Sequence, residues 1–190
     1  MKKEDLPKKI PVFPLSNFII FPSSTVPLNI FEPRYLEMID ESMKGNRLIG
    51  MIQPKKTGEL KKPNLYDVGC AGKIVSFNET EDGRYLIVLN GVCRFRILKE
   101  IQENKKLYRE CSINFNEYID DLDSNNKKLS TARMDFILNS LKLLYKKQGY
   151  TINLKDIESQ SSDKKIDTLS MASPFTLEEK QILIETIDLD

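Results

Sequence analysis

Short apolar runs with a two-residue period fill the first two thirds of the chain, and apolar residues with a 3.6-residue period fill the last third. A two-residue period places alternate side chains on one face of a strand, whereas the longer period gives one face of a helix. The first part is therefore predicted to be β-rich. Its strand candidates are residues 10–13, 18–21, 25–29, 47–52, 71–77, 85–89, 92–99 and 107–118.

The strand candidate at 92–99 has a clear division of its side chains. Cys93, Phe95 and Ile97 share one face, while Arg94 and Arg96 share the other. Such alternation is expected of a strand with one buried and one solvated face.

Two segments in this part carry turn or loop residues. Asn90-Gly91 lies between two apolar runs, and this dipeptide predicts a hairpin turn because it tolerates positive φ at both central positions. Residues 55–64 hold several lysines, a glycine and a proline between strand candidates, which predicts a loop.

One helix is predicted inside the β-rich part, from Pro33 to Gly45. Proline suits the first helical position, and glycine is common just after the last turn. Apolar residues at helical spacing give this segment a face that is expected to pack on the sheet.

A polar, turn-rich segment at 120–126 separates the β-rich part from the helical part. Helices are predicted at 129–147, 152–159 and 164–172, and a last helix follows Ser173-Pro174. Thr176 and Glu179 have the spacing of a capping box at its start. The pattern thus predicts an α+β fold with a β-barrel-like part at 1–119 and a helical part at 120–190.

Composition narrows the class of protein. The 190 residues suit one domain or two small ones, and 40% hydrophobic with 30% charged residues is typical of a soluble globular protein. The formal net charge is only +1, whereas binders of nucleic acid usually carry a basic surplus. No run approaches the roughly 20 apolar residues of a membrane span, and acidic residues and prolines interrupt any signal-peptide pattern. The protein is therefore expected to be cytoplasmic, without a membrane partner.

The side chains needed for common catalytic sites are missing. There is no histidine, which excludes Ser-His-Asp, Cys-His and HExxH sites. Cys70, Cys93 and Cys111 lack metal-ligand spacing, so they are expected to be small buried hydrophobes. No phosphate-binding loop is present either. The sequence therefore predicts no catalytic residues, no metal and no cofactor.

An aspartate group at the predicted boundary has the ligand type of a calcium site. Asp120, Asp121 and Asp123 lack the glycine and the distal glutamate of an EF-hand loop. They are therefore expected to belong to a solvated linker.

Three sequence blocks, in order, resemble the Lon N-terminal (substrate-binding) domain family of ATP-dependent protease La. They are IPVFPLSNFIIFPSSTVPLNIFEPRY at 10–35, DGRY followed by LIVLNGVCRFRI at 82–97, and SPFTLEEKQILIETIDL at 173–189. The resemblance implies a PUA-like β pseudo-barrel followed by a C-terminal helical bundle. It also implies that the chain lacks the ATPase and Ser-Lys peptidase domains of full-length Lon proteases.

The function implied by this resemblance is non-catalytic recognition of unfolded or hydrophobic polypeptide segments. Such a module would assist protein degradation or quality control, together with a separate protease or chaperone. The residues predicted to bind peptide lie in the first block, and each could instead belong to the core. They are Phe18, Ile19, Phe21, Phe31, Arg34 and Tyr35.

Arginines at three positions match the family motifs. Arg34, Arg84 and Arg94 are expected to be structural, because a planar guanidinium can join loop carbonyls to carboxylates such as Glu32 or Asp82. Anchoring of a peptide backbone or carboxylate is the functional alternative.

The alternative function is that of an RNA-binding PUA-like module. It would use the lysine-rich loop at 55–62, which carries four lysines and one glutamate. Salt separates the two hypotheses, because phosphate-driven binding weakens steeply with ionic strength and apolar peptide binding does not.

Overall fold

A computed structural model describes residues 1–59, 62–101, 105–123, 131–147, 149 and 162–187. Its strands are β1 (Lys9–Pro14), β2 (Thr25–Ile30), β3 (Leu48–Ile52), β4 (Pro54–Glu59), β5 (Lys62–Leu65), β6 (Val68–Glu79), β7 (Tyr85–Ile101) and β8 (Arg109–Asn114). Its helices are α1 (Pro33–Lys44), α2 (Thr131–Lys147), α4 (Ser162–Ala172) and α5 (Leu177–Glu185), with short 3-10 helices η1 (Lys3–Asp5) and η2 (Asn116–Leu122). The predicted α+β class is confirmed.

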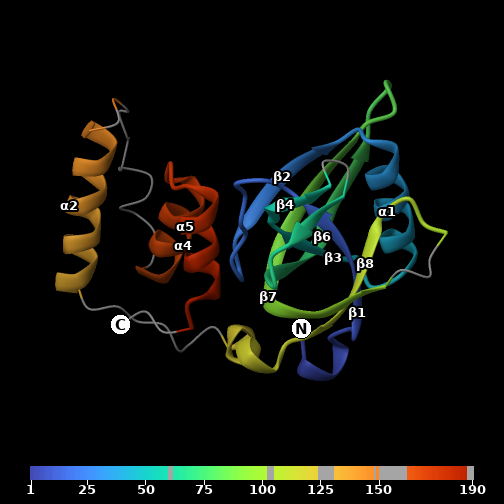
Figure 1. The fold of residues 1–190 in the computed structure, drawn as a ribbon, viewed down its shortest axis with the longest axis horizontal. Helices are drawn as coiled ribbons and strands as arrows, with labels where there is room; N and C mark the ends of the chain where they lie inside the picture. The colour runs from blue at the N-terminus through green and yellow to red at the C-terminus, as the bar shows by residue number, and fades with distance from the viewer. Residues whose placement is uncertain (60–61, 102–104, 124–130, 148, 150–161, 188–190) are drawn as a thin grey trace.

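Six of the described strands form one sheet, in the order β2-β7-β6-β3-β1-β8. Strand β7 also pairs with β8, so β7, β6, β3, β1 and β8 make a closed circuit of pairings. The β1–β3 pair is parallel and the other pairs are antiparallel. Strands β4 and β5 form a separate hairpin. In Figure 1, α1 lies on one side of this sheet and α2, α4 and α5 lie on the other side.

Two hydrophobic clusters hold the sheet to its neighbours. One joins the sheet to α1 and α5, and it includes Met38, Ile39, Leu89 and Ile184. The other is formed mainly by strand residues and η2, and it includes Ile10, Val12, Leu48, Phe95, Cys111 and Tyr118. A third cluster, between α2 and α4, contains Met134, Leu138, Leu141 and Leu169. Cys70, Cys93 and Cys111 are free and buried, as expected.

The helix predictions agree with the structure wherever it describes the chain. Helix α1 begins at Pro33 and is followed by Gly45. Helix α2 covers residues 131–147 of the segment predicted at 129–147, and α4 covers the segment predicted at 164–172. Residues 129–130 and the helix predicted at 152–159 lie outside the described residues. At the start of α5, Glu179 N donates to Thr176 Oγ1 at 3.2 Å, and Thr176 N donates to Glu179 Oε2 at 2.8 Å. The capping box is confirmed.

The predicted hairpin turn at Asn90-Gly91 is wrong, because both residues lie inside the single strand β7. Gly91 serves a different purpose. A Cβ at this position would collide with the carbonyl group of Phe21, so glycine allows close approach of the two backbones. Ser23 N donates to Gly91 O and Gly91 N donates to Ser24 O, both at 2.8 Å.

The predicted strand at 18–21 is also wrong, although its apolar character has a cause. This segment is not in a strand, and it is bracketed by positive φ at Asn17 (57°) and Ser23 (64°). Ile19, Ile20 and Phe21 nevertheless fill the core cluster between the sheet and the helices. Burial without strand pairing gives the same apolar run as a buried strand would.

The predicted loop at 55–64 is wrong as well, because β4 and β5 occupy its described residues, 55–59 and 62–64. The hairpin has a register irregularity between Pro54 and Gly58, and Gly58 adopts φ 99°. In β5, Lys62 and Asn64 are exposed while Pro63 and Leu65 are half-buried. Exposed and half-buried residues therefore alternate as in a strand, but the prolines and lysines of this segment are typical of a loop.

The strand predicted at 107–118 ends early, and its last residues form η2. This turn brings Asp121 to Arg94. Both side chains are buried and their ion pair is 2.8 Å long, so Asp121 is not solvated and Arg94 does not lie on a solvated face. The assignments of a solvated linker and a half-buried strand are therefore wrong at these two positions, because η2 and α5 cover that face of β7.

No helix in the described part of the chain is both long enough and apolar enough to cross a membrane.

Candidate functional site

A groove of about 660 Å³ opens where the ends of several segments meet: β1, α1, the β4–β5 hairpin, the end of β7 and the start of β8. Its volume is in the range of small-ligand and peptide side-chain pockets. It is lined by Pro14, Ser16, Arg34, Tyr35, Pro54, Lys62, Pro63, Glu100, Ile101, Lys106, Leu107, Tyr108 and Arg109. We call these residues the groove.

An ion-pair cluster forms one wall of the groove. Arg109 Nε and Nη2 donate to the two carboxylate oxygens of Glu100 at 2.9 and 2.7 Å, and Arg109 Nη1 donates to Pro63 O at 2.7 Å. Lys62 Nζ lies 3.3 Å from Glu100. Burial opposes ionisation of Glu100, but the hydrogen bonds from Arg109 and Lys62 outweigh it and lower the pKa of this carboxyl. The wall is therefore charged, and it fastens β5 to β7 and β8.

The opposite wall begins at the first turn of α1. The guanidinium of Arg34 lies 4.8 Å from the centre of the Tyr35 ring and forms an ion pair of 2.6 Å with Glu32. The Tyr35 ring lies 4.2 Å from the ring of Phe13. Burial raises the pKa of the Tyr35 hydroxyl, although the nearby Arg34 opposes this. The structural pairing predicted for Arg34 with Glu32 is confirmed.

The structure distributes the six predicted peptide-binding residues differently. Arg34 and Tyr35 line the groove, and Phe31, three residues before Arg34, is 63% exposed. Ile19, Phe21 and Tyr35 belong to the buried core, and Phe18 is a half-buried residue packed against it. In this conformation Phe31 and Arg34 are the members of the set that a bound chain can cover extensively, while Ile19 and Phe21 support the fold.

Several groove residues were missed by the sequence interpretation. Leu107 is 64% exposed, and the adjacent Tyr108 ring is buried with Lys106 Nζ 5.2 Å from its centre. Leu107 N donates to Glu37 of α1 at 3.4 Å. Nothing in the linear pattern joins the end of β7 or residues 105–109 to α1 or β5, because only the closed circuit of strands brings these segments together. The one local signal in the sequence is Leu107 directly after the lysine pair at 105 and 106.

The other two arginines of the motifs also have structural partners. Arg84 Nε lies 2.9 Å from Asp82 at the surface. Arg94 is buried, pairs with Asp121, and donates to the carbonyl groups of Ile184 and Thr186 at the end of α5. The predicted structural role of Arg94 is confirmed, with partners that the sequence did not indicate.

Three described lysines of the β4–β5 hairpin face carboxylates. Lys55 lies 3.7 Å from Asp67, Lys56 lies 2.8 Å from Glu178 and Lys62 lies 3.3 Å from Glu100. Each of these ion pairs reduces the positive potential available to a phosphate group. The hairpin is therefore a mixed-charge surface.

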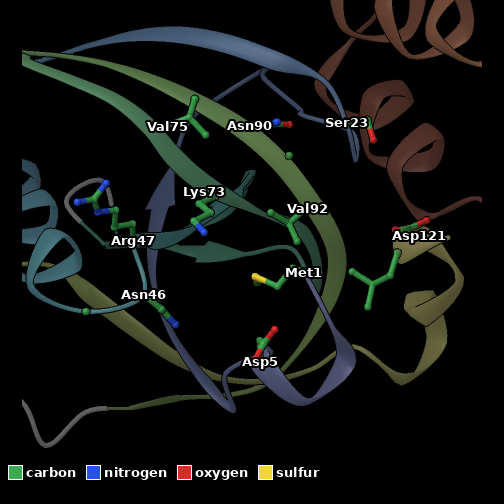
Figure 2. A pocket seen from close by; sticks show the side chains of 13 residues that line it. Met1, Asp5, Ser23, Asn46, Arg47, Lys73, Val75, Asn90, Val92 and Asp121 are labelled. Carbon is green, nitrogen blue, oxygen red and sulfur yellow. The ribbon is translucent and has the colours of Figure 1, made fainter. Parts of the chain in front are cut away.

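A second cavity, of about 700 Å³, lies on the concave side of β6 and β7 (Figure 2). It holds Arg47, Lys73 and Asp5, together with Met1 and other apolar groups. The Oδ1 atom of Asn90, which lines it, is buried and has no hydrogen-bond partner among the described residues. None of the six predicted residues lines this cavity, so the groove is the better candidate site.

The side chains of the groove offer hydrogen-bond donors, acceptors and apolar surface to a ligand. Arginine and lysine donors, carboxylate acceptors and exposed apolar groups together match a polypeptide, which has polar backbone groups and apolar side chains. Within the described residues, no group of three or more His, Cys, Asp or Glu side chains is placed to hold a metal ion.

The chain resembles one protein family along almost its whole length. The family model described as "ATP-dependent protease La (LON) substrate-binding domain" matches residues 9–190. Lon protease 2 of Myxococcus xanthus is 26% identical over 201 residues, which cover 100% of this chain and 23% of that protein. Lon protease of Desulfosudis oleivorans is 27% identical over 192 residues, which cover 98% of this chain and 23% of that protein. The chain thus spans about 23% of the length of these two relatives.

Two solved structures share the fold. A Lon N-terminal domain protein from Xanthomonas campestris has a TM-score of 0.64 at 18% identity, covering 95% of this chain and 91% of the other. The N-terminal domain of the Mycobacterium avium complex Lon protease has a TM-score of 0.62 at 16% identity, with the same coverage.

Proposed function

The chain belongs to the ATP-dependent protease La (LON) substrate-binding domain family, and we propose that it binds polypeptide segments in the groove. The matching model is that of a substrate-binding domain and does not include an ATPase or peptidase domain. The proposed activity is therefore recognition without turnover, with unfolded or hydrophobic segments as ligands. The observation that carries it is the groove itself, which places exposed Leu107 beside Arg34 and the Glu100–Arg109 pair.

Each part of the groove has a task in this proposal. Leu107 in the groove, together with Phe31, which lies outside it three residues before Arg34, supplies apolar surface that a bound side chain covers. Covering most of one such side chain is worth about 1 to 2 kcal/mol. Arg34 and Lys106 are placed to donate to backbone carbonyls of the bound chain. The four cationic side chains of the groove pair with Glu100 inside it and with Glu32 and Glu110 beside it, which offsets much of their charge. The costs of association offset much of the apolar gain, so binding in the micromolar range is expected.

The finer assignments follow from the same proposal. We infer that the closed circuit of strands corresponds to a PUA-like pseudo-barrel over residues 1–119, with a helical part over 120–190. We further propose that the chain acts in the cytoplasm and assists protein degradation or quality control by presenting bound segments to a separate protease or chaperone.

A matched pair of leucine substitutions tests the proposal. Leu107 lines the groove and is 64% exposed, whereas Leu98 is 59% exposed on β7 and lines none of the cavities described above. Binding of fluorescein-labelled unfolded peptides is followed by fluorescence anisotropy. Leu107→Ser should weaken binding roughly 5- to 30-fold, which corresponds to about 1 to 2 kcal/mol. Leu98→Ser should leave the dissociation constant within about twofold.

Salt distinguishes this function from RNA binding. Between 0.05 and 0.5 M salt, peptide affinity should change little, whereas phosphate-driven affinity would fall by orders of magnitude. Absence of peptide binding at high micromolar protein, or equal effects of the two leucine substitutions, would refute the proposal. Tight, salt-sensitive binding of single-stranded RNA would favour the alternative.

A further inference from the structure

Helix α2 carries apolar side chains on two opposite sides, and one of these sides is uncovered. Its core-facing side chains are buried, among them Met134, Leu138, Leu141 and Tyr145. Phe136 and Leu143 are 73% and 70% exposed, and they are the most exposed large hydrophobic side chains in the described part of the chain. Because they are seven residues apart, they lie almost in line along the helix, on the side opposite the core.

The uncovered side of α2 is basic at one end. Lys146 and Lys147 follow Leu143 by three and four residues, so they lie one turn further along and on either side of its line. Both are exposed, and neither makes an ion pair within the described residues. We call Phe136, Leu143, Lys146 and Lys147 the α2 face.

Helix α5 carries an exposed apolar residue beside acidic side chains, which complements the apolar and basic α2 face. Ile182 is 66% exposed, with Glu178 and Glu179 one turn before it and Glu185 one turn after it. All three glutamates are exposed. Glu178 pairs with Lys56, but this surface pair is largely solvated, and the face remains acidic in sum. We call these four residues of α5 the α5 face.

The two faces belong to one chain but cannot meet within it. The α2 face points away from the cluster that α2 forms with α4. In Figure 1, α2 lies at the edge of the molecule, with α4 and α5 between it and the sheet. Their complementary charge and shared apolar content therefore suit a contact between copies.

We propose that the α2 face of one copy packs on the α5 face of a second copy. Leu143 and Phe136 lie against Ile182 in this contact, and the lysines at the end of α2 lie against the glutamates of α5. The two surfaces differ, so the contact is head-to-tail and leaves one free face at each end of a pair. Larger assemblies or closed rings therefore follow at high concentration. A contact between two helices is small, so the association is weak, and its ion pairs make it sensitive to salt.

Charge reversal on each face provides the test. Lys146→Glu/Lys147→Glu makes the α2 face acidic, and Glu178→Lys/Glu185→Lys makes the α5 face basic. Sedimentation velocity is measured from about 10 to 300 µM at low salt and again in 0.5 M salt. The wild-type sedimentation coefficient should rise with concentration at low salt. Each variant alone should associate about 10-fold or more weakly, because like charges now face each other.

Mixing the two variants decides the question. In an equimolar mixture each reversed face meets a face of opposite charge, so association should recover. This recovery also shows that both variants are folded. Leu143→Asp should abolish association, while Leu98→Asp serves as a control on a different surface.

Two results would overturn the proposal: a wild-type chain that stays monomeric throughout the range, or a mixture that does not recover. If wild type stays monomeric and the α2 variants lose binding to phosphatidylserine vesicles, the α2 face is assigned to a membrane surface instead. The groove residues are unchanged in all these variants. Peptide binding therefore stays testable whatever the outcome.

Discussion

Replacing Arg94 by methionine should destabilise the protein far more than any exposed arginine substitution. The side chain of Arg94 is 3% exposed and that of its partner Asp121 is 1% exposed. Arg94 Nε and Nη2 each donate to Asp121 at 2.8 Å, and Nη1 donates to two carbonyl groups at the end of α5. The guanidinium also lies 4.5 Å from the centre of the Tyr118 ring. One side chain thus joins β7, η2 and α5.

The expected magnitude follows from what methionine leaves behind. It fills a similar volume, but the buried Asp121 carboxylate loses its ion pair with Arg94, and breaking a buried ion pair typically costs about 3 to 5 kcal/mol. The backbone N–H of residue 94 still donates to Asp121 at 3.0 Å, so part of the interaction remains. With a urea slope of about 2 kcal/mol/M, the unfolding midpoint should fall by about 1.5 to 2.5 M.

Urea unfolding followed by far-UV and near-UV circular dichroism measures this change, and coincident transitions would support two-state analysis. Should Arg94→Met fail to fold, Arg94→Lys keeps the charge but loses the two-pronged geometry, and it should cost about 1 to 2 kcal/mol. The double variant Arg94→Met/Asp121→Asn should be more stable than Arg94→Met, since it also removes the buried negative charge that the Arg94 guanidinium offsets.

Arg96 provides a matched control on the same strand. It makes an equally short two-pronged pair with Glu117, at 2.7 and 2.9 Å, but the two side chains are 39% and 32% exposed. Arg96→Met should therefore cost less than about 1 kcal/mol. A cost for Arg94→Met within 1 kcal/mol of that for Arg96→Met would refute the reasoning, because burial would then not decide the worth of the pair.

Two further predictions concern the backbone and a buried lysine. Gly91→Ala should lower the free energy of unfolding in urea by about 3 kcal/mol, because its Cβ meets the Phe21 carbonyl. Gly83→Ala, in open space at φ 76°, should lower it by about 1 kcal/mol. Similar losses in the two variants would contradict this explanation. Burial lowers the pKa of Lys180 below the ordinary 10.5, so its unfolded form binds more protons and stability should rise as pH increases toward 10.5. Comparison with Lys180→Met between pH 7 and 10 measures this rise, and equal pH slopes would contradict it.

The elements that the sequence determined by itself are those whose signals are local. Pro33 begins α1, and the Thr176 and Glu179 capping box begins α5, because these residues satisfy helix ends within a few positions of the chain. The three motif blocks indicated the family, and the α+β class followed from a change of period near residue 120. These properties do not depend on which segments meet in space.

The tertiary structure alone decided what distant segments do to one another. Gly91 carried a strong turn signal, yet it lies within β7 because the backbone of residues 21–24 passes against it. Asp121 lies in a polar segment with the composition of a linker, but η2 places its side chain against Arg94. The groove likewise depends on closure of the strand circuit, which places Leu107 and Arg109 beside Arg34. Local propensity is weak compared with the free energy of burying apolar surface and pairing buried charges, so the packing of distant segments determined these positions.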